Sequence, residues 1–288
     1  MRHRQETTAN LLLGLTALIW GLAFTAQRVG MDFMGPLTFN GIRFLLGGIT
    51  LIPLAWGLGE RTLPALWMLR RGMVLGGVLF LGAWLQQLGI CWTTAGNAGF
   101  ITGLYVLLVP VLGYPFGQRA GLGTWVGACL ALTGMYLLSV TEEFSMNRGD
   151  VLVLFSAVFW AVHVLAIGRF SAGLRAGEAV ILSIVQFLTC GLISLAGALT
   201  SETIALHGLR QGLIPILYGG LGSVGVAYTL QVIAQRHARP APAAIILSLE
   251  AVFAALGGWA VLGETMTLRA MLGCGLMLLG TITAQLRP

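Results

Sequence analysis

The chain has 288 residues, of which 57% are hydrophobic and only 9% are charged, with a mean hydropathy of +0.89. A soluble domain carries about 25% charged residues, so this composition excludes a water-soluble globule, and it equally excludes a disordered chain. All 16 basic residues are arginines scattered between apolar runs, which excludes the basic stripe of a nucleic-acid-binding protein.

Ten apolar runs follow one another along the chain, each long enough to be a membrane-spanning helix of about 20 residues. The expected helices cover residues 10–27, 38–57, 72–91, 97–116, 122–140, 150–168, 178–199, 211–234, 241–262 and 268–286. The first run is longer than the hydrophobic part of a signal peptide and lacks a clear cleavage site, so we expect it to be retained. Only short loops and tails remain, so any functional site is expected within the membrane bundle.

The arginines indicate how these helices are oriented. If the N-terminus lies inside, inner segments hold 11 arginines, and the outer loops hold only Arg28, Arg148, Arg210 and Arg269. Arginine is enriched in cytoplasmic loops, so both termini are expected in the cytoplasm. Arg43 alone lies within a span, where its side chain is expected to snorkel toward the outer surface. The alternative is a salt bridge or contact with a substrate anion.

The two halves of the chain resemble each other. LTALIWGLAF at 15–24 aligns with FSAVFWAVHV at 155–164, and IRFLLGG at 42–48 aligns with VQFLTCG at 185–191. Further on, Gly127 and Gly134 fall on Gly273 and Gly280. Five spans per half is an odd number, so the second half must enter the membrane from the opposite face. Residues 1–145 and 146–288 are therefore expected to be inverted repeats, which are typical of secondary transporters.

Several segments carry a resemblance to a known family: TTAGNAGFITGLYVLLVPVL at 93–112, GDVLVLFSAVFWA at 149–161 and PAPAAIILSLEAVFAALGGWAVLGE at 240–264. They resemble the drug/metabolite transporter superfamily in its ten-helix EamA-type branch. The resemblance implies an all-α integral membrane protein, with two inverted five-helix repeats around a central cavity. It also implies export of amino acids or other small metabolites across a bacterial inner membrane, without fixing the substrate.

Tryptophans near the middle of two spans are the first candidates for lining such a cavity. Trp20 shares a helical face with Thr16 and Gln27, and Trp160 shares one with Ser156 and His163. Polar residues inside a span usually face the bundle interior. The alternative is an aromatic belt at the lipid surface, which fits less well because both tryptophans lie away from the ends of their spans.

Amide and phenol side chains extend this candidate substrate site. Gln86 and Gln87 lie in the third span, and Tyr228 and Gln231 share a face of the eighth. Amides bind either carboxylate or ammonium groups because they offer both donors and acceptors. The alternative is that they join helices by hydrogen bonds within the bundle. Tyr105 in the fourth span is expected to add an aromatic wall.

The titratable candidates are Glu250 and His163. A carboxylate within a span costs about 2.5–3.5 kcal/mol, so Glu250 is either a coupling or cation-binding group or a structural acid that braces helices. His163 is either a proton-sensitive substrate contact or a satisfied packing residue. Pro110 and Pro240 are candidate hinges, since proline interrupts helical hydrogen bonding, although static kinks explain them equally well.

No catalytic, nucleotide-binding or metal-binding motif is found, and Cys91, Cys129, Cys190 and Cys274 form no CxxC pair. We therefore expect no enzyme activity, cofactor or metal, and transport driven by a gradient. The leading expectation is an exporter of neutral or aromatic amino acids that works by alternating access as a monomer or weak dimer, with proton coupling as an option. The alternatives are an exporter of organic cations or drugs and, more remotely, a membrane enzyme or receptor.

Overall fold

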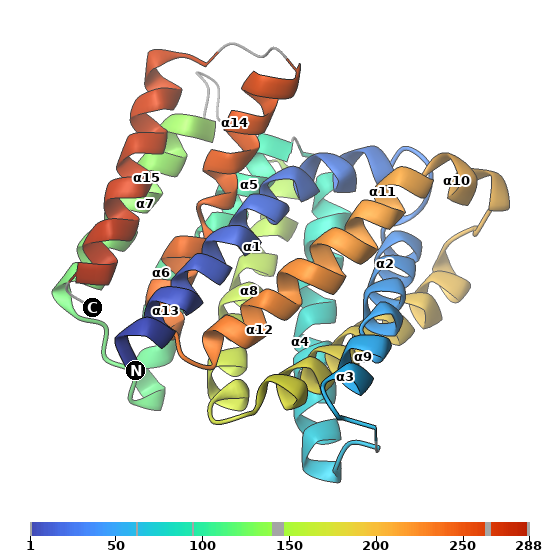
Figure 1. Cartoon of the computed structure of the whole chain (residues 1–288). Helices are drawn as coiled ribbons and strands as arrows, with labels where there is room; N and C mark the ends of the chain where they lie inside the picture. The colour runs from blue at the N-terminus through green and yellow to red at the C-terminus, as the bar shows by residue number, and fades with distance from the viewer. Residues whose placement is uncertain (1, 62, 94, 140–146, 263–265, 287–288) are drawn as a thin grey trace.

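The computed structural model describes residues 2–61, 63–93, 95–139, 147–262 and 266–286, and this part of the chain is helical without strands. In the first half the helices are α1 (Arg2–Gly30), α2 (Pro36–Thr50), α3 (Ile52–Gly57), α4 (Leu66–Ile90), α5 (Ala95–Gly103), α6 (Tyr105–Gly113), η1 (Tyr114–Phe116) and α7 (Leu122–Ser139). In the second half they are α8 (Arg148–Ser171), α9 (Ala176–Ser201), α10 (Leu206–Gln211), α11 (Leu213–Leu217), η2 (Tyr218–Tyr228), α12 (Thr229–Gln235), α13 (Pro240–Leu247), α14 (Glu250–Leu262) and α15 (Leu268–Leu286). The helices form one bundle, in which α1 begins and α15 ends toward the same side (Figure 1).

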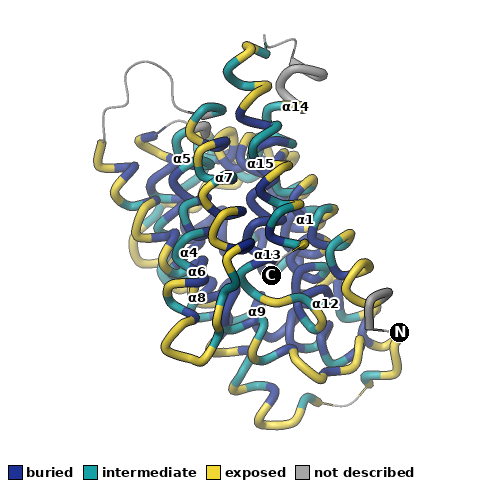
Figure 2. The backbone as a smooth tube through the Cα atoms, turned by 90° about the vertical axis from the view of Figure 1, so that its left-hand side faces the viewer, coloured by how far each residue is buried: buried dark blue, intermediate teal, exposed yellow. Residues whose placement is uncertain are grey.

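Eight of the helical stretches in the described residues are long and apolar enough to cross a membrane. Residues Leu122–Leu138 and Pro240–Leu256 form two shorter apolar helices that complete the bundle. Large apolar side chains cover the outward faces of the helices; on α1, for example, Leu11, Leu15 and Leu22 are exposed, whereas Leu13 and Ala17 are buried. In Figure 2 the buried stretches of the backbone lie mostly toward the middle of the bundle. A surface of this kind suits hydrocarbon rather than water.

Glycines allow close packing between α7 and α15 at the edge of the bundle (Figure 1). A Cβ atom on Gly127 would lie 2.5 Å from the carbonyl oxygen of Gly280, and one on Gly134 would lie 2.5 Å from that of Gly273. Small residues let membrane helices approach to backbone contact in this way. The sequence alignment pairs Gly127 with Gly273 and Gly134 with Gly280. If each residue is replaced by its aligned partner in the other half, the contact between Gly127 and Gly280 becomes the contact between Gly273 and Gly134. Contacts of this kind are what an inverted repeat predicts.

The antiparallel helices α2 and α9 form a second seam between the two halves. At one end, the carboxylate of Glu202 accepts hydrogen bonds from the backbone nitrogens of Leu37 and Thr38, both at 2.8 Å, and caps α2. At the other end, Glu60 lies beside Gly177 in the first turn of α9 and pairs with Arg175 at 3.2 Å. Each acid thus lies where one helix of the seam begins and a helix of the other half ends. The two acids occupy corresponding positions in the two halves, because Glu202 lies beside Gly35 as Glu60 lies beside Gly177.

Two membrane helices are interrupted midway. The fourth expected span is divided at Leu104 into α5 and α6, and the ninth is divided at Ser248 and Leu249 into α13 and α14. At these breaks some backbone hydrogen bonds join residues that are three apart in the sequence, instead of the four of an α-helix. Examples are the bonds from Leu107 N to Leu104 O and from Ala251 N to Ser248 O. The sequence predicted one span in each place, with candidate hinges at Pro110 and Pro240 and not at these residues. Discontinuous helices in corresponding positions of the two halves are typical of transporter binding sites.

Candidate functional site

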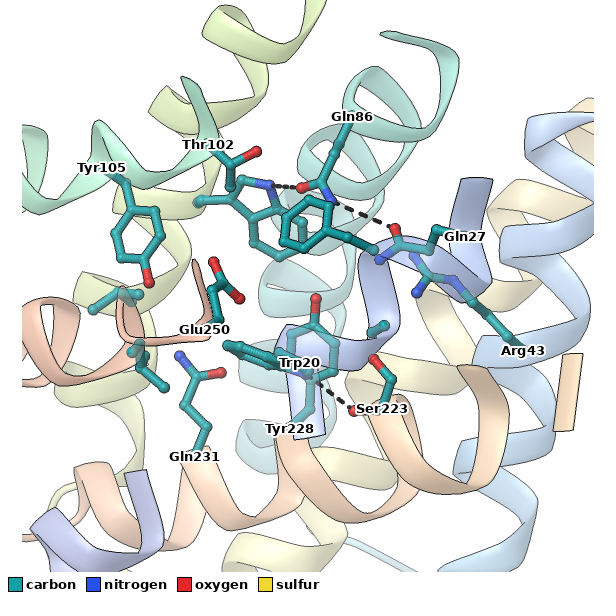
Figure 3. A pocket seen from close by; sticks show the side chains of 15 residues that line it. Trp20, Gln27, Arg43, Gln86, Thr102, Tyr105, Ser223, Tyr228, Gln231 and Glu250 are labelled. Atoms are coloured by element: carbon teal, nitrogen blue, oxygen red, sulfur yellow. Dashed lines mark hydrogen bonds between the residues drawn. The ribbon is translucent and has the colours of Figure 1, made fainter. Parts of the chain in front are cut away.

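A cavity lies between the two interrupted helices and the helices that face them, and Figure 3 shows the side chains that line it. The first half of the chain contributes Trp20, Ala23, Phe24, Gln27, Arg43, Gln86, Thr102 and Tyr105. The second half contributes Trp160, Val164, Ser223, Tyr228, Gln231, Leu247 and Glu250. Both halves thus build the same cavity.

A chain of hydrogen bonds crosses one wall of the cavity. The indole nitrogen of Trp160 donates to Oε1 of Gln86 at 2.6 Å, and Nε2 of Gln86 donates to Oε1 of Gln27 at 3.4 Å (Figure 3). Nε2 of the neighbouring Gln87 donates to the carbonyl oxygen of Gln27 at 3.2 Å. These bonds connect α8 to α4 and α1, so the position of the Trp160 ring depends on the amides of the other half.

Aromatic rings pack together at the centre of the site. The ring of Tyr228 lies 4.5 Å from that of Trp20 and 6.1 Å from that of Trp160, edge-on to the first and nearly parallel to the second. The rings of Phe44 and Phe187 approach Tyr228 from behind, at 6.0 and 5.9 Å. Aromatic pairs at these distances attract one another beyond simple burial. Tyr228 therefore fills the space between the two tryptophans in this conformation.

The π-helical turns of η2 offer carbonyl groups to the first helix. The indole nitrogen of Trp20 donates to the carbonyl oxygen of Ser223 at 3.3 Å, and Oγ1 of Thr16 donates to that of Ala227 at 3.1 Å. Such wide turns occur frequently at functional sites. The tryptophan stripe expected on α1 is thus anchored to the backbone of the opposite half, and it does not form part of a lipid-facing belt.

Two charged side chains line the cavity without forming a pair. Glu250 is 6% exposed, and its carboxylate makes no hydrogen bond or ion pair with the described residues. Arg43 is 2% exposed, so the expected snorkelling to the surface does not occur. Its guanidinium lies 4.8 Å from the ring centre of Phe44 and 5.3 Å from that of Phe39, and its Nε donates to Oδ1 of Asn40 at 2.9 Å.

Polar atoms of two further cavity residues also have no partner among the described residues. They are Oγ1 of Thr102 and Oε1 of Gln231, and both are buried. A buried polar atom without a hydrogen bond costs about 1–3 kcal/mol, so such atoms are rare unless water or a ligand satisfies them. The cavity therefore presents a donor or acceptor on several sides.

Six of the eight residues predicted to bind substrate line this cavity: Trp20, Gln86, Tyr105, Trp160, Tyr228 and Gln231. The predicted acid Glu250 lines it as well. Gln87 is fully buried behind Gln86, and His163 bonds to Oε1 of Gln186 on α9 at 2.9 Å while its ring packs against Trp160 and Tyr228. These two residues thus support the aromatic wall from behind.

The candidate hinges lie away from the two helix breaks. Pro110 is an interior residue of α6, and Pro240 is the first residue of α13, where proline fits without losing a hydrogen bond. The breaks at Leu104 and Ser248 were not predicted, because Gly103 and the polar residues Ser248 and Glu250 are also compatible with continuous spans. The lining residues Thr102 and Ser223 were also missed, since isolated hydroxyls in an apolar run give no signal.

The cavity is narrow in this conformation. It holds about 40 Å³ of space that a water molecule can occupy. That is room for a few waters, whereas pockets for organic ligands measure about 300–1,000 Å³. Binding of an organic solute therefore requires the lining side chains or helices to move apart. The described residues contain no group of three or more histidine, cysteine or acidic side chains that could hold a metal ion.

Comparison with known proteins connects this architecture to transport. The model of the EamA-like transporter family matches residues 7–140 and again residues 147–284. An uncharacterized transporter of Archaeoglobus fulgidus is 34% identical over 97% of this chain and 86% of its own length. The uncharacterized inner membrane transporter YedA of Escherichia coli is 24% identical over 99% of this chain and 93% of its own length.

One solved crystal structure of a protein superimposes with a TM-score of 0.80, over 97% of both chains and at 20% identity, which shows a shared fold. The family model covers both halves of the sequence, and the relatives that match almost the whole chain bear the names of transporters. The chain is thus a multi-pass membrane protein that belongs to the EamA-like transporter family of the drug/metabolite transporter superfamily.

Proposed function

We propose that this protein is a gradient-driven transporter that exports small organic metabolites, foremost neutral and aromatic amino acids, through the cavity between its two halves. The observation that carries the proposal is the shared cavity, in which Trp20 and Tyr105 of one half face Trp160 and Tyr228 of the other. Aromatic walls stack on planar side chains, and the amides of Gln86 and Gln231 suit the polar end of such a solute.

Alternating access accounts for the narrow cavity. The ring of an aromatic substrate would take the place of Tyr228 between the two tryptophans when the halves part. The paired contacts of α7 with α15, and of α2 with α9, support two inverted five-helix repeats with their boundary near residues 145–146. Together with the two shorter apolar helices, the eight long ones would make ten spans. The arginine distribution favours cytoplasmic termini in a bacterial inner membrane.

The experiment is uptake into proteoliposomes that contain the purified protein. A mixed panel of labelled amino acids, organic cations and organic anions is offered in both directions, with and without a proton gradient. We expect saturable movement of neutral amino acids, with the aromatic ones competing best. Empty liposomes provide the background. If no amino acid moves or competes, the substrate assignment fails.

Export of organic cations is a second candidate, favoured by the unpaired carboxyl of Glu250 beside aromatic faces. Cations bind both to carboxylates and to the faces of aromatic rings. In that case the cations of the panel move and the amino acids do not. Replacement of Glu250 by glutamine then abolishes their transport, while replacement of Arg43 leaves it intact.

A further inference from the structure

The cavity contains one acid and one base that remain apart. Among the described residues, Glu250 has no ion-pair partner, and Arg43 bonds only to the neutral side chain of Asn40. In the view of Figure 3, the two groups lie on either side of the Tyr228 hydroxyl. An isolated charge inside a membrane bundle is expensive, so such groups are usually paired or face a functional cavity. Here each one faces the same cavity.

The surroundings of Arg43 hold its guanidinium ready for an anion. The guanidinium carbon lies over the rings of Phe39 and Phe44, and Asn40 accepts a hydrogen bond from Nε. These contacts hold the group in place and leave its two terminal nitrogens without a hydrogen-bond partner among the described residues. A guanidinium presents its terminal nitrogens in a fork that matches the two oxygens of a carboxylate.

The surroundings of Glu250 are complementary. Its carboxyl lies at the start of α14, directly after the helix break, and shares the cavity wall with Tyr105, Trp160 and Gln231. Aromatic faces attract ammonium groups, and Oε1 of Gln231 is an acceptor for which the described part of the chain provides no donor. This end of the cavity therefore suits a cation, whereas the Arg43 end suits an anion.

We propose that the transported solute is a zwitterion whose carboxylate binds Arg43 and whose ammonium group binds Glu250, so that the two ends of one substrate join the two halves of the protein. This inference rests on the proposed function and adds the orientation of the substrate and the residues that select its charges. The cavity has no net charge when both groups are ionised, so it favours a solute with one charge of each sign. Because the two side chains are not in contact, the solute must reach across the cavity.

The test uses matched ligands with the purified protein in detergent. L-phenylalanine is compared with its carboxamide, which keeps only the ammonium group, and with N-acetylphenylalanine, which keeps only the carboxylate. The zwitterion, the carboxamide and the N-acetyl form of 6-aminohexanoate are tested as well, because this molecule has a larger distance between its two charged groups. Dissociation constants are obtained from the ligand-dependent rise in melting temperature, which does not depend on passage across a membrane. We expect one of the two zwitterions to bind about 10- to 100-fold more tightly than its own single-charge forms.

Two variants then test which side chain recognises which charge of the ligand. Arg43→Gln is expected to lose the preference for the zwitterion over the carboxamide and to keep the preference over the N-acetyl form. Glu250→Gln is expected to show the reverse. Arg43→Lys and Glu250→Asp, which keep the charge, should restore part of each preference. Arg210→Gln, an exposed arginine outside the cavity, is the control and should change neither.

The outcomes separate the two proposals. If wild-type protein moves amino acids but Arg43→Gln and Glu250→Gln leave both preferences unchanged, the assignment of the two charges to Arg43 and Glu250 is overturned and the transport function stands. The assignment is also overturned if each variant loses both preferences equally. If wild-type protein neither binds nor moves any zwitterion, the proposed substrate class fails before the charges are considered.

Discussion

The seam between α7 and α15 and the central cavity show two opposite ways of placing small and polar residues in one membrane bundle. At the seam, Gly127 and Gly134 bring the two backbones into contact with Gly280 and Gly273. In the cavity, large aromatic rings are held by hydrogen bonds across the two halves, and the buried Oγ1 of Thr102 and Oε1 of Gln231 have no partner among the residues described. The seam leaves no room for even one methyl group, whereas the cavity has unsatisfied groups that a solute can bind.

Stability and the selection of solutes are therefore expected to depend on different regions of this chain. A substitution in the seam must move backbone atoms, so its effect should appear in stability. A substitution in the cavity changes side chains on the expected path of the solute, so its effect should appear in the selection of solutes. The two kinds of measurement therefore distinguish the two regions.

The largest expected effect is at the seam, in Gly134→Ala. The new Cβ atom would lie 2.5 Å from the carbonyl oxygen of Gly273, so the helices must separate, at a cost of about 1–3 kcal/mol. Gly275→Ala on α15 is the matched control, since no atom lies within 4 Å of its Cβ position. Thermal unfolding in detergent should show a lower melting temperature for the first variant only. Equal melting temperatures would show that the seam is loosely packed.

The two ends of the α2–α9 seam give the next comparison. Glu202 accepts two backbone bonds and one from the Thr38 hydroxyl at 2.7 Å, whereas Glu60 pairs with Arg175, whose side chain is 74% exposed. Loss of a helix cap costs about 0.5–2 kcal/mol, and loss of an exposed ion pair costs about 0–1 kcal/mol. Glu202→Ala should therefore lower the melting temperature more than Glu60→Ala. The reverse order would contradict the assigned capping role.

A smaller effect, confined to ligand binding, is expected for Trp160→Phe. This change removes the 2.6 Å bond that orients the ring and reduces the aromatic face offered to the solute. A loss of about 1 kcal/mol in that aromatic contact corresponds to roughly a fivefold weaker affinity for the transported solute. Trp84→Phe is the control, because Trp84 stacks on Phe80 at 5.8 Å and does not line the cavity. Unchanged affinity in Trp160→Phe, or an equal loss in both variants, would remove Trp160 from the binding site.

Much of the candidate site could be predicted from the sequence because a helix repeats every 3.6 residues. Trp20 and Trp160 align between the halves, and both lie on the cavity wall. The helical repeat does not, however, distinguish between adjacent residues or between residues on the same helical face. Gln86 reaches the cavity and Gln87 does not, and His163 shares the face of Trp160 but turns to Gln186. Which neighbour faces the cavity depends on the packing of other helices.

Arg43 shows what the sequence could have indicated. Its neighbours Phe39 and Phe44 shield the guanidinium from lipid, and Asn40, three residues earlier on the same helix, accepts its Nε bond. This local pattern favours a buried arginine over one that snorkels. The breaks at Leu104 and Ser248 have a weaker signal, namely Gly103 in one segment and Ser248 with Glu250 in the other, which a continuous helix also tolerates.

If the cavity between the halves is the path of the substrate, bound solute must protect a single cysteine placed in the cavity from chemical modification. Cys91, Cys129, Cys190 and Cys274 are replaced by alanine or serine, and Thr102, whose hydroxyl lacks a partner in the cavity, becomes cysteine. A small thiol reagent is applied to proteoliposomes in which this variant retains transport. We predict that the transported solute slows the modification of Thr102→Cys in a saturable manner, with a half-maximal concentration equal to that for transport. A modification rate that is the same with and without saturating solute would show that the substrate does not pass through this cavity.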